Sequence, residues 1–166
     1  LERRDGAQVG GRWVEAREAL RSARDTLEEP TDALPPFWDE LAGMGWLGLH
    51  VAEAFGGSGF GLMELAGVLE ELGRACAPGP IVPTVLAAAV IDRLGDDDAR
   101  AAYLPGLVDG SSPGAVAFAS DPAVDEWAAV LGAVTAGVVV VPMDDGWSVV
   151  PAAGLAVEEH KSLDPT

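Results

Sequence analysis

The side chains that most often perform acid–base, nucleophilic or metal chemistry are few and scattered in this sequence. The two histidines, His50 and His160, lie 110 positions apart, and neither belongs to a HExxH motif, a cysteine cluster or a serine nucleophile elbow. We expect His50 to end a strand and make a local hydrogen bond rather than to act as a catalyst. Carboxylates are plentiful, but no neighbouring feature selects one as a general acid or base. The sequence therefore names no catalytic residue.

The single cysteine and the one run of aspartates both have structural interpretations. Cys76 continues the apolar stripe of a predicted helix, so we expect a small core residue rather than a reactive thiol. One cysteine permits no internal disulfide, which is compatible with a reducing compartment. The aspartates at 96–98 are followed by Ala99 and Arg100 rather than by oxygen ligands at loop spacing. We therefore expect them to cap a helix, and we predict no metal site.

The most distinctive segment is rich in glycine and spans residues 45–61, with glycines at 45, 48, 56, 57, 59 and 61. Such a segment turns sharply, and it serves either close helix packing or the wall of a pocket. Its G-G-x-G-x-G string is similar to a dinucleotide-binding fingerprint. That fingerprint needs a preceding buried strand inside a βαβ unit, whereas helices are predicted on both sides here. We therefore reject a dinucleotide site.

Helices are predicted throughout the first part of the chain. Apolar residues every three or four positions predict a helix over residues 12–29 and a third one carrying Leu62, Leu65, Leu69 and Leu72, with Glu70 and Arg74 as an i,i+4 ion pair. Pro35 and Pro36 open the second helix, which Gly43 or Gly45 ends. A fourth helix follows three prolines and spans residues 84–94, and a fifth runs from the aspartates to residues 104–105.

The period of the sequence changes near residue 113. Short apolar or β-branched runs at 115–119, 128–131, 137–142, 147–150 and 155–160 predict a mostly antiparallel sheet. Helices followed by strands indicate an α+β fold. We expect a helical domain over residues 1–112 and a small antiparallel β-domain, shortened or incomplete, over residues 113–166.

Composition restricts the partners. A net charge of −17 disfavours nucleic acid, whose binding depends on Lys and Arg. The apolar runs are too short to span a bilayer, and the first residues lack the core of a signal peptide, so we expect a soluble cytoplasmic protein without a membrane partner. Because the chain opens on Leu1 and stops shortly after a predicted strand, we expect it to be a piece of a longer protein.

Five strings in order resemble the acyl-CoA dehydrogenase family, in the form common in actinobacteria: MGWLGL at 44–49, EAFGGSG at 53–59, LEELGR at 69–74, YLPGLVDG at 103–110 and SLDPT at 162–166. The resemblance implies an N-terminal helical domain and a middle β-domain, with the second helical domain of the family absent from this chain. It also implies that residues 53–61 and the following helix help to form the wall of an acyl-chain pocket.

The resemblance further implies a flavin site. The family's Ala-Leu-Thr-Glu-Pro string corresponds to residues 118–122, which makes Ala119, Ser120 and Asp121 the candidate FAD-binding residues. Ser120 keeps a hydroxyl and Asp121 keeps a shorter carboxylate, but the family's following Gly-Ser-Asp and Trp-Ile-Thr segments have no counterpart. Residues 113–166 carry one basic side chain, Lys161, against eight acidic ones. We therefore expect this chain to hold FAD poorly or not at all on its own.

By resemblance, the activity is oxidoreduction: α,β-dehydrogenation of an acyl-CoA thioester with a fatty or steroid side chain, with FAD as electron acceptor. The family's catalytic glutamate lies in the second helical domain, so no catalytic residue is assigned here. We expect this chain to be inactive alone and to act in lipid or steroid degradation as the flavin-poor partner of a homologous acyl-CoA dehydrogenase subunit in a hetero-oligomer. Two alternatives stay open: a flavin-dependent monooxygenase of the same fold, and a non-catalytic scaffold subunit.

Overall fold

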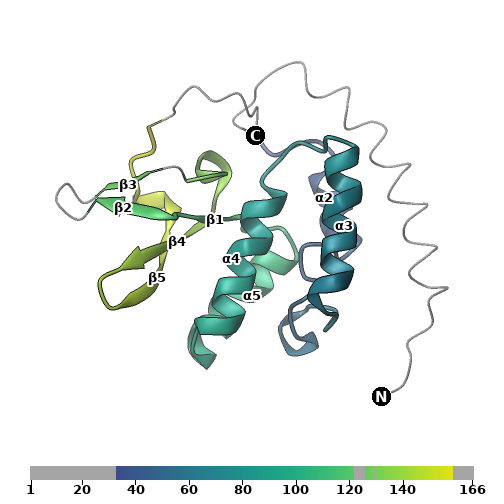
Figure 1. Cartoon of the computed structure of the whole chain (residues 1–166), viewed down its shortest axis with the longest axis horizontal. Coiled ribbons are helices and arrows are strands. Elements are labelled where there is room, and N and C mark those ends of the chain that lie inside the picture. The colour runs from purple at the N-terminus through teal and green to yellow at the C-terminus, as the bar shows by residue number, and fades with distance from the viewer. Residues whose placement is uncertain (1–32, 122–125, 129, 159–166) are drawn as a thin grey trace.

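Helices occupy one side of the molecule and strands the other (Figure 1). The computed structural model describes residues 33–121, 126–128 and 130–158. The helices are α2 (Trp38–Gly43), α3 (Leu62–Arg74), α4 (Ile81–Leu94) and α5 (Asp97–Val108), with short 3-10 turns η2 (Glu53–Phe55), η3 (Ala133–Thr135) and η4 (Ala152–Gly154). The predicted order of helices before strands is confirmed, and with it the α+β fold class. The helix predicted over residues 12–29 lies outside the described residues.

Helix α2 begins and ends as the sequence predicts. The backbone N–H of Trp38 donates to the carbonyl of Pro35 at 2.9 Å, so the two prolines form the turn that starts the helix. Gly45 follows the helix with a φ of +74°. Because glycine adopts this left-handed conformation without a steric penalty, it reverses the chain there.

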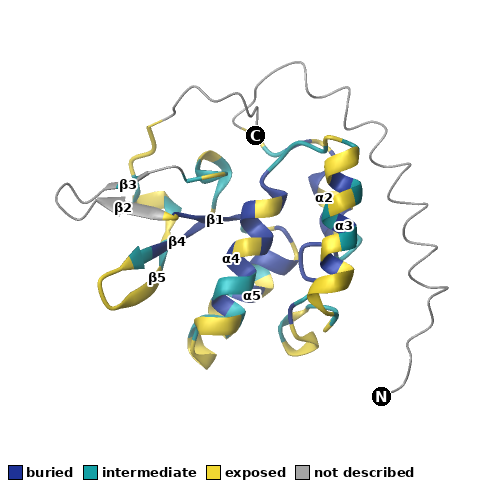
Figure 2. Cartoon of the chain, in the orientation of Figure 1, coloured by how far each residue is buried: buried dark blue, intermediate teal, exposed yellow. Residues whose placement is uncertain are grey.

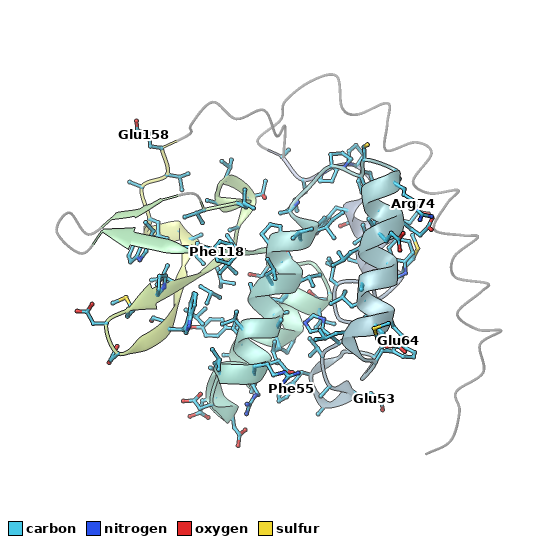
Figure 3. The ribbon with its side chains drawn as sticks, in the orientation of Figure 1. Glu53, Phe55, Glu64, Arg74, Phe118 and Glu158 are labelled. Atoms are coloured by element: carbon cyan, nitrogen blue, oxygen red, sulfur yellow. The ribbon has the colours of Figure 1, made fainter. Side chains whose placement is uncertain are left out.

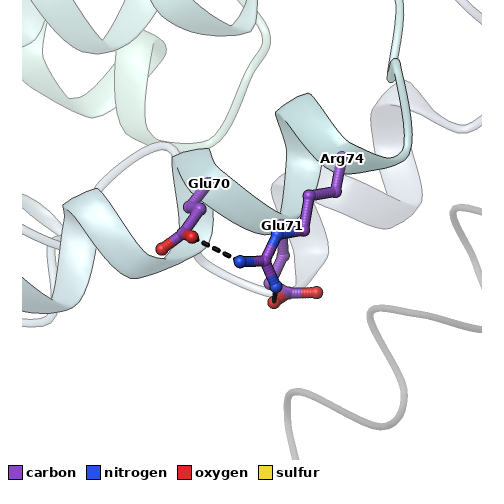
Figure 4. Close-up of polar contacts among 3 residues, drawn as sticks. All are labelled: Glu70, Glu71 and Arg74. Atoms are coloured by element: carbon purple, nitrogen blue, oxygen red, sulfur yellow. Dashed lines mark hydrogen bonds and ion pairs between the residues drawn. The ribbon is translucent and has the colours of Figure 1, made fainter.

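Helix α3 buries Leu65, Val68 and Leu72 against α2 and the residues around Trp46. The predicted ion pair is present, since Arg74 Nη2 lies 2.5 Å from Glu70 Oε1, and Arg74 Nη1 also contacts Glu71 (Figure 4). The prediction that Cys76 lies in the core is wrong, because the helix ends at Arg74. Cys76 is exposed, with a φ of +50°, in the turn that leaves the helix.

Two helix boundaries differ from the prediction, and both involve proline. Helix α4 begins at Ile81, three residues early, with Pro83 in its first turn, where amide donors have no intrahelical partner. Helix α5 continues through Pro105 to Val108. Asp96 caps α5 as predicted, because its Oδ1 accepts a hydrogen bond from Ala99 N at 2.8 Å.

The strands form a small mixed sheet and a separate hairpin. In the sheet, β1 (Gly114–Val116) pairs with β4 (Val138–Met143), which pairs with β5 (Gly146–Pro151). The pair β4–β5 is antiparallel, but β1 and β4 are parallel, so the expectation of a mostly antiparallel sheet needs this correction. A separate hairpin, formed by β2 (Ala119–Asp121) and β3 (Glu126–Ala128), lies between β1 and β4 in the sequence. Residues 155–158, predicted as a strand, are not in a strand.

The helical layer and the sheet meet where α4 and α5 cover β1. Figure 2 shows β1 and the adjoining part of β4 buried, whereas the far end of the β4–β5 hairpin is exposed. One cluster joins Ala87, Ala88 and Ile91 of α4 to Leu104 and Leu107 of α5 and to strand residues Val116 and Val140. This continuous apolar contact fixes the position of the strands against the helices.

Candidate functional site

The glycine-rich loop, residues 48–61, is a compact unit closed by its own backbone. Ser58 N donates to Gly48 O at 3.0 Å, Gly59 N to Val51 O at 2.9 Å, and Phe60 N to Leu49 O at 2.8 Å. These hydrogen bonds join the start of the loop to its end. The loop therefore has a defined shape without a ligand.

The glycines of this loop serve two structural purposes. A Cβ on Gly48 would overlap the side chain of Val108 on α5, and a Cβ on Gly57 would overlap the carbonyl group of Val51. Gly56 and Gly59 instead have φ values of +86° and +64°. Close packing and tight turning, both expected from the sequence, thus explain these four glycines.

The outer rim of the loop carries acidic and apolar side chains. Figure 3 shows Glu53, Phe55 and Glu64 at the same end of the helical part. Glu64 Oε2 accepts a hydrogen bond from Gly61 N at 3.0 Å, which fixes the start of α3. Beside it, Leu62 and Met63 are 59% and 82% exposed. This end of α3 is therefore an apolar surface next to the loop.

His50 differs from the prediction both in its backbone position and in its hydrogen bonding. It lies in a turn rather than at the end of a strand, and both ring nitrogens are buried without a hydrogen-bond partner. Burial lowers the pKa of His50 below its usual value, while the nearby charge of Asp92 acts in the opposite direction. The imidazole is therefore neutral at pH 7. The apolar residues on both sides of it favoured a strand, and no sequence signal predicted an unsatisfied ring.

The three candidate flavin residues lie side by side on one short strand. Ala119, Ser120 and Asp121 form β2 and pair with Ala128, Trp127 and Glu126 of β3. The structure describes only the backbone of the three candidates, so the role of their side chains stays a prediction. Just before them, Phe118 is 61% exposed where the chain passes from β1 to β2 (Figure 3).

The connection from β3 to β4 folds onto the beginning of α4. Leu131 forms an isolated bridge with Val116, and Gly132 has a φ of +74°. A Cβ on Gly132 would lie 2.9 Å from Pro83 Cγ and 3.1 Å from Pro80 Cβ. This connection is therefore packed against the helical layer.

Metal binding and membrane crossing both find no support in the described residues. Among residues 33–121, 126–128 and 130–158, no group of three or more His, Cys, Asp or Glu side chains could hold a metal ion. None of the helices in this described part combines the length and apolar character that crossing a bilayer requires.

Comparison with protein families gives a match over residues 14–111 to the acyl-CoA dehydrogenase N-terminal domain. Acyl-CoA dehydrogenase FadE34 of Mycobacterium tuberculosis is 31% identical over 172 aligned residues, which cover 97% of this chain and 23% of the relative. The chain thus spans about a quarter of that relative.

Solved structures share the fold. The Tcur3481–Tcur3483 steroid ACAD, in a variant form, is 31% identical with a TM-score of 0.71, over 89% of this chain and 48% of that one. A chain of the ChsE4–ChsE5 complex from Mycobacterium tuberculosis is 19% identical with a TM-score of 0.70, over 92% of this chain and 49% of that one. The chain spans about half the length of each.

Proposed function

We propose, from the premise that this chain belongs to the acyl-CoA dehydrogenase family, that it supplies the N-terminal helical domain and the first part of the middle β-domain of a dehydrogenase subunit. Membership, expected from the five strings, is confirmed by the family match and by the FadE34 relative. The division that we propose lies between residues 112 and 113. The assembly removes hydrogen from Cα and Cβ of an acyl-CoA thioester, and FAD would supply the electron acceptor.

The predicted flavin segment is short, and this supports the more specific proposal that the chain binds FAD poorly on its own. Strand β2 ends at Asp121 and β3 begins at Glu126, so the candidate residues lie on a three-residue strand of an isolated hairpin. A flavin ring needs a preformed cleft with a few placed donors. The family's second flavin-contacting segment, Trp-Ile-Thr, has no counterpart in this chain, and Gly132 in the connection from β3 to β4 packs against Pro80 and Pro83. These features do not fit a flavin held by this chain alone.

Charge supports the same proposal. FAD and CoA both carry a pyrophosphate, which basic side chains or helix N-termini usually bind. Residues 113–166 have Lys161 as their single basic side chain and eight acidic ones. A partner that brings basic residues would satisfy the pyrophosphate better than this chain does.

We therefore propose that the chain acts as the flavin-poor partner of a homologous acyl-CoA dehydrogenase subunit. The ChsE4–ChsE5 structure is that of a complex between two proteins. The Tcur3481–Tcur3483 structure is described as a steroid ACAD, that is, an acyl-CoA dehydrogenase, and its name joins two proteins in the same way. By analogy, the substrate would be the CoA thioester of a steroid or fatty side chain.

The test measures flavin content and activity with and without the partner. The protein is purified alone and after co-expression with the adjoining gene for a homologous subunit, and bound FAD is released and quantified per chain. We expect substoichiometric FAD for the lone protein, and one FAD per heterodimer together with acyl-CoA turnover in the complex. Tightly bound FAD at one per lone chain would reject the flavin-poor assignment.

A non-catalytic scaffold is the second candidate, and the same poor fit to flavin favours it. The two candidates differ in whether the complex depends on this chain for turnover. If the partner subunit, purified alone, oxidises acyl-CoA with an artificial electron acceptor as fast as the complex does, the scaffold is supported. A complex that is active only when this chain is present supports the dehydrogenase subunit.

A further inference from the structure

We propose that His50 is an acid-sensitive latch for the glycine-rich loop. The loop, residues 48–61, stays closed by its backbone hydrogen bonds while the imidazole is neutral and opens when the ring takes a second proton. The inference goes beyond the proposed function, because it does not depend on whether this chain holds FAD or binds an acyl-CoA.

The environment of the His50 ring disfavours a positive charge. Both nitrogens of His50 are buried, and neither has a hydrogen-bond partner. A neutral imidazole already has one donor and one acceptor unsatisfied there. A second proton converts the acceptor into another donor and adds a positive charge. Burial of an unpaired charge is far more costly than burial of a neutral polar group, so the charged ring must reach water or a carboxylate.

The position of His50 in the backbone links its ring to the closure of the loop. The carbonyl of Leu49 accepts from Phe60 N, and the carbonyl of Val51 accepts from Gly59 N. The residues on both sides of His50 therefore hold the two ends of the loop together. A movement that exposes the ring displaces at least one of these carbonyls, so exposure of the imidazole and opening of the loop are coupled.

The outer part of the loop can move at a lower cost than the helices. Leu49 and Val51 anchor the start of the loop in the core, and Phe55 and Phe60 pack partly against it. Between and beside these anchors, Glu53, Ala54, Gly56, Gly59 and Gly61 of the loop are all exposed. Exposed backbone between a few anchors opens at a lower free energy than a helix that is packed along its length. Protonation therefore releases the loop before it unfolds the helices.

Among the described residues, Asp92 of α4 is the charged group that acts on the His50 ring, and its negative charge favours the protonated imidazole. The other charged or titratable side chains on the surrounding elements are Asp39 and Glu40 of α2, Glu53 of η2, Glu64, Glu70, Glu71 and Arg74 of α3, Arg93 of α4, and Asp97, Asp98, Arg100 and Tyr103 of α5. None of these is among the causes that act on His50. Removal of the Asp92 charge should therefore shift loop release to lower pH.

The test is amide hydrogen exchange between pH 7.5 and 5.0, corrected for the intrinsic pH dependence of exchange, on the purified protein. We expect exchange of the amides of Ser58, Gly59 and Phe60 to rise by up to about tenfold per pH unit below the ordinary histidine value, the limit for uptake of one proton. Amides in the middle of α4 exchange only when the whole protein unfolds, so they should remain much better protected than the loop amides throughout this range. Asp92→Asn should move the onset to lower pH.

His50→Gln keeps a polar side chain that does not titrate, and His160→Gln is the matched control at the other histidine. We expect His50→Gln to abolish the acid response and His160→Gln to keep it. An unchanged response in His50→Gln would overturn the proposal. If His50→Gln does not fold, NMR titration of the His50 ring in the unmodified protein decides instead: the ring and the loop amides must change with one midpoint, and a ring that titrates while the loop stays protected rejects the latch.

Discussion

The hydroxyl of Thr84 accepts a hydrogen bond from the backbone N–H of Gly114, with Oγ1 and N 3.1 Å apart. The same hydroxyl donates to the carbonyl of Pro80 at 2.6 Å. Thr84 is fully buried on α4, and Gly114 is the first residue of β1, so one side chain joins the helical part to the sheet. This contact helps to hold the start of β1, the strand that precedes the predicted flavin segment.

Thr84→Val should therefore destabilise the protein. Valine has the same shape but no hydroxyl, which leaves the buried N–H of Gly114 without this acceptor, and an unsatisfied buried donor costs about 1–3 kcal/mol. Urea unfolding measures the change in the free energy of unfolding. Thr84→Ser keeps the hydroxyl and should recover part of the loss. Destabilisation by Thr84→Ser without destabilisation by Thr84→Val would show that the methyl group, not the hydrogen bond, matters.

Gly114→Ala tests the closeness of α4, α5 and β1. A Cβ at Gly114 would lie 2.6 Å from Ala87 Cβ and 2.7 Å from Leu107 Cδ2, so the layers must separate, at a cost of about 1–3 kcal/mol. The control is Gly73→Ala in α3, where a Cβ would meet nothing within 4 Å. That variant should gain about 0.5–1 kcal/mol from helix propensity. If thermal unfolding shifts in the same direction for both variants, the packing argument is wrong.

The global stability should also depend on His50. Because the pKa of His50 is lower in the folded state than its ordinary value of 6.5, the unfolded chain binds the proton more tightly. The contribution of His50 to stability is therefore complete above pH 6.5 and decreases as the pH falls through the folded value. His50→Leu should remove this loss between pH 7 and 5 without a loss of stability at pH 7, because the ring makes no hydrogen bond. Urea unfolding at a series of pH values tests this, and a variant with the same pH slope as the unmodified protein would contradict it.

The helical part could be predicted because its signals are local. The stripe through Leu65 and Leu72, the cap at Asp96 and the turn at Gly45 each depend on neighbours within a few positions. The predicted helix boundaries near Pro83 and Pro105 were wrong. Proline ends a helix only where the missing backbone N–H, or the contact of its ring with the preceding turn, cannot be accommodated. The family resemblance, rather than periodicity, identified the segment at Ala119, Ser120 and Asp121, and its role stays a prediction.

Non-local features could not be predicted. The parallel pairing of β1 with β4 depends on how residues 117–137 fold between them, and strand patterns alone do not give direction. The charge that acts on His50 comes from Asp92 of α4, some forty positions away in sequence. Cys76 left the apolar stripe because α3 ended two residues earlier. For the sheet and for His50, an interaction between distant segments decided the outcome, whereas Cys76 depended on where its own helix ends.

The last prediction concerns Trp38, whose indole Nε1 donates to the carbonyl of Gly110 at 2.9 Å. This bond joins α2 to the turn after α5 and so holds the two ends of the described helical part together. Trp38→Phe removes the donor and part of a fully packed side chain, so the free energy of unfolding should fall by about 1–3 kcal/mol. Arg74→Ala, which removes an ion pair with Glu70 in which both side chains are more than half exposed, should change it by less than about 1 kcal/mol. Chemical unfolding followed by circular dichroism compares the two variants, and a larger effect from Arg74→Ala would refute this ranking of buried and surface contacts.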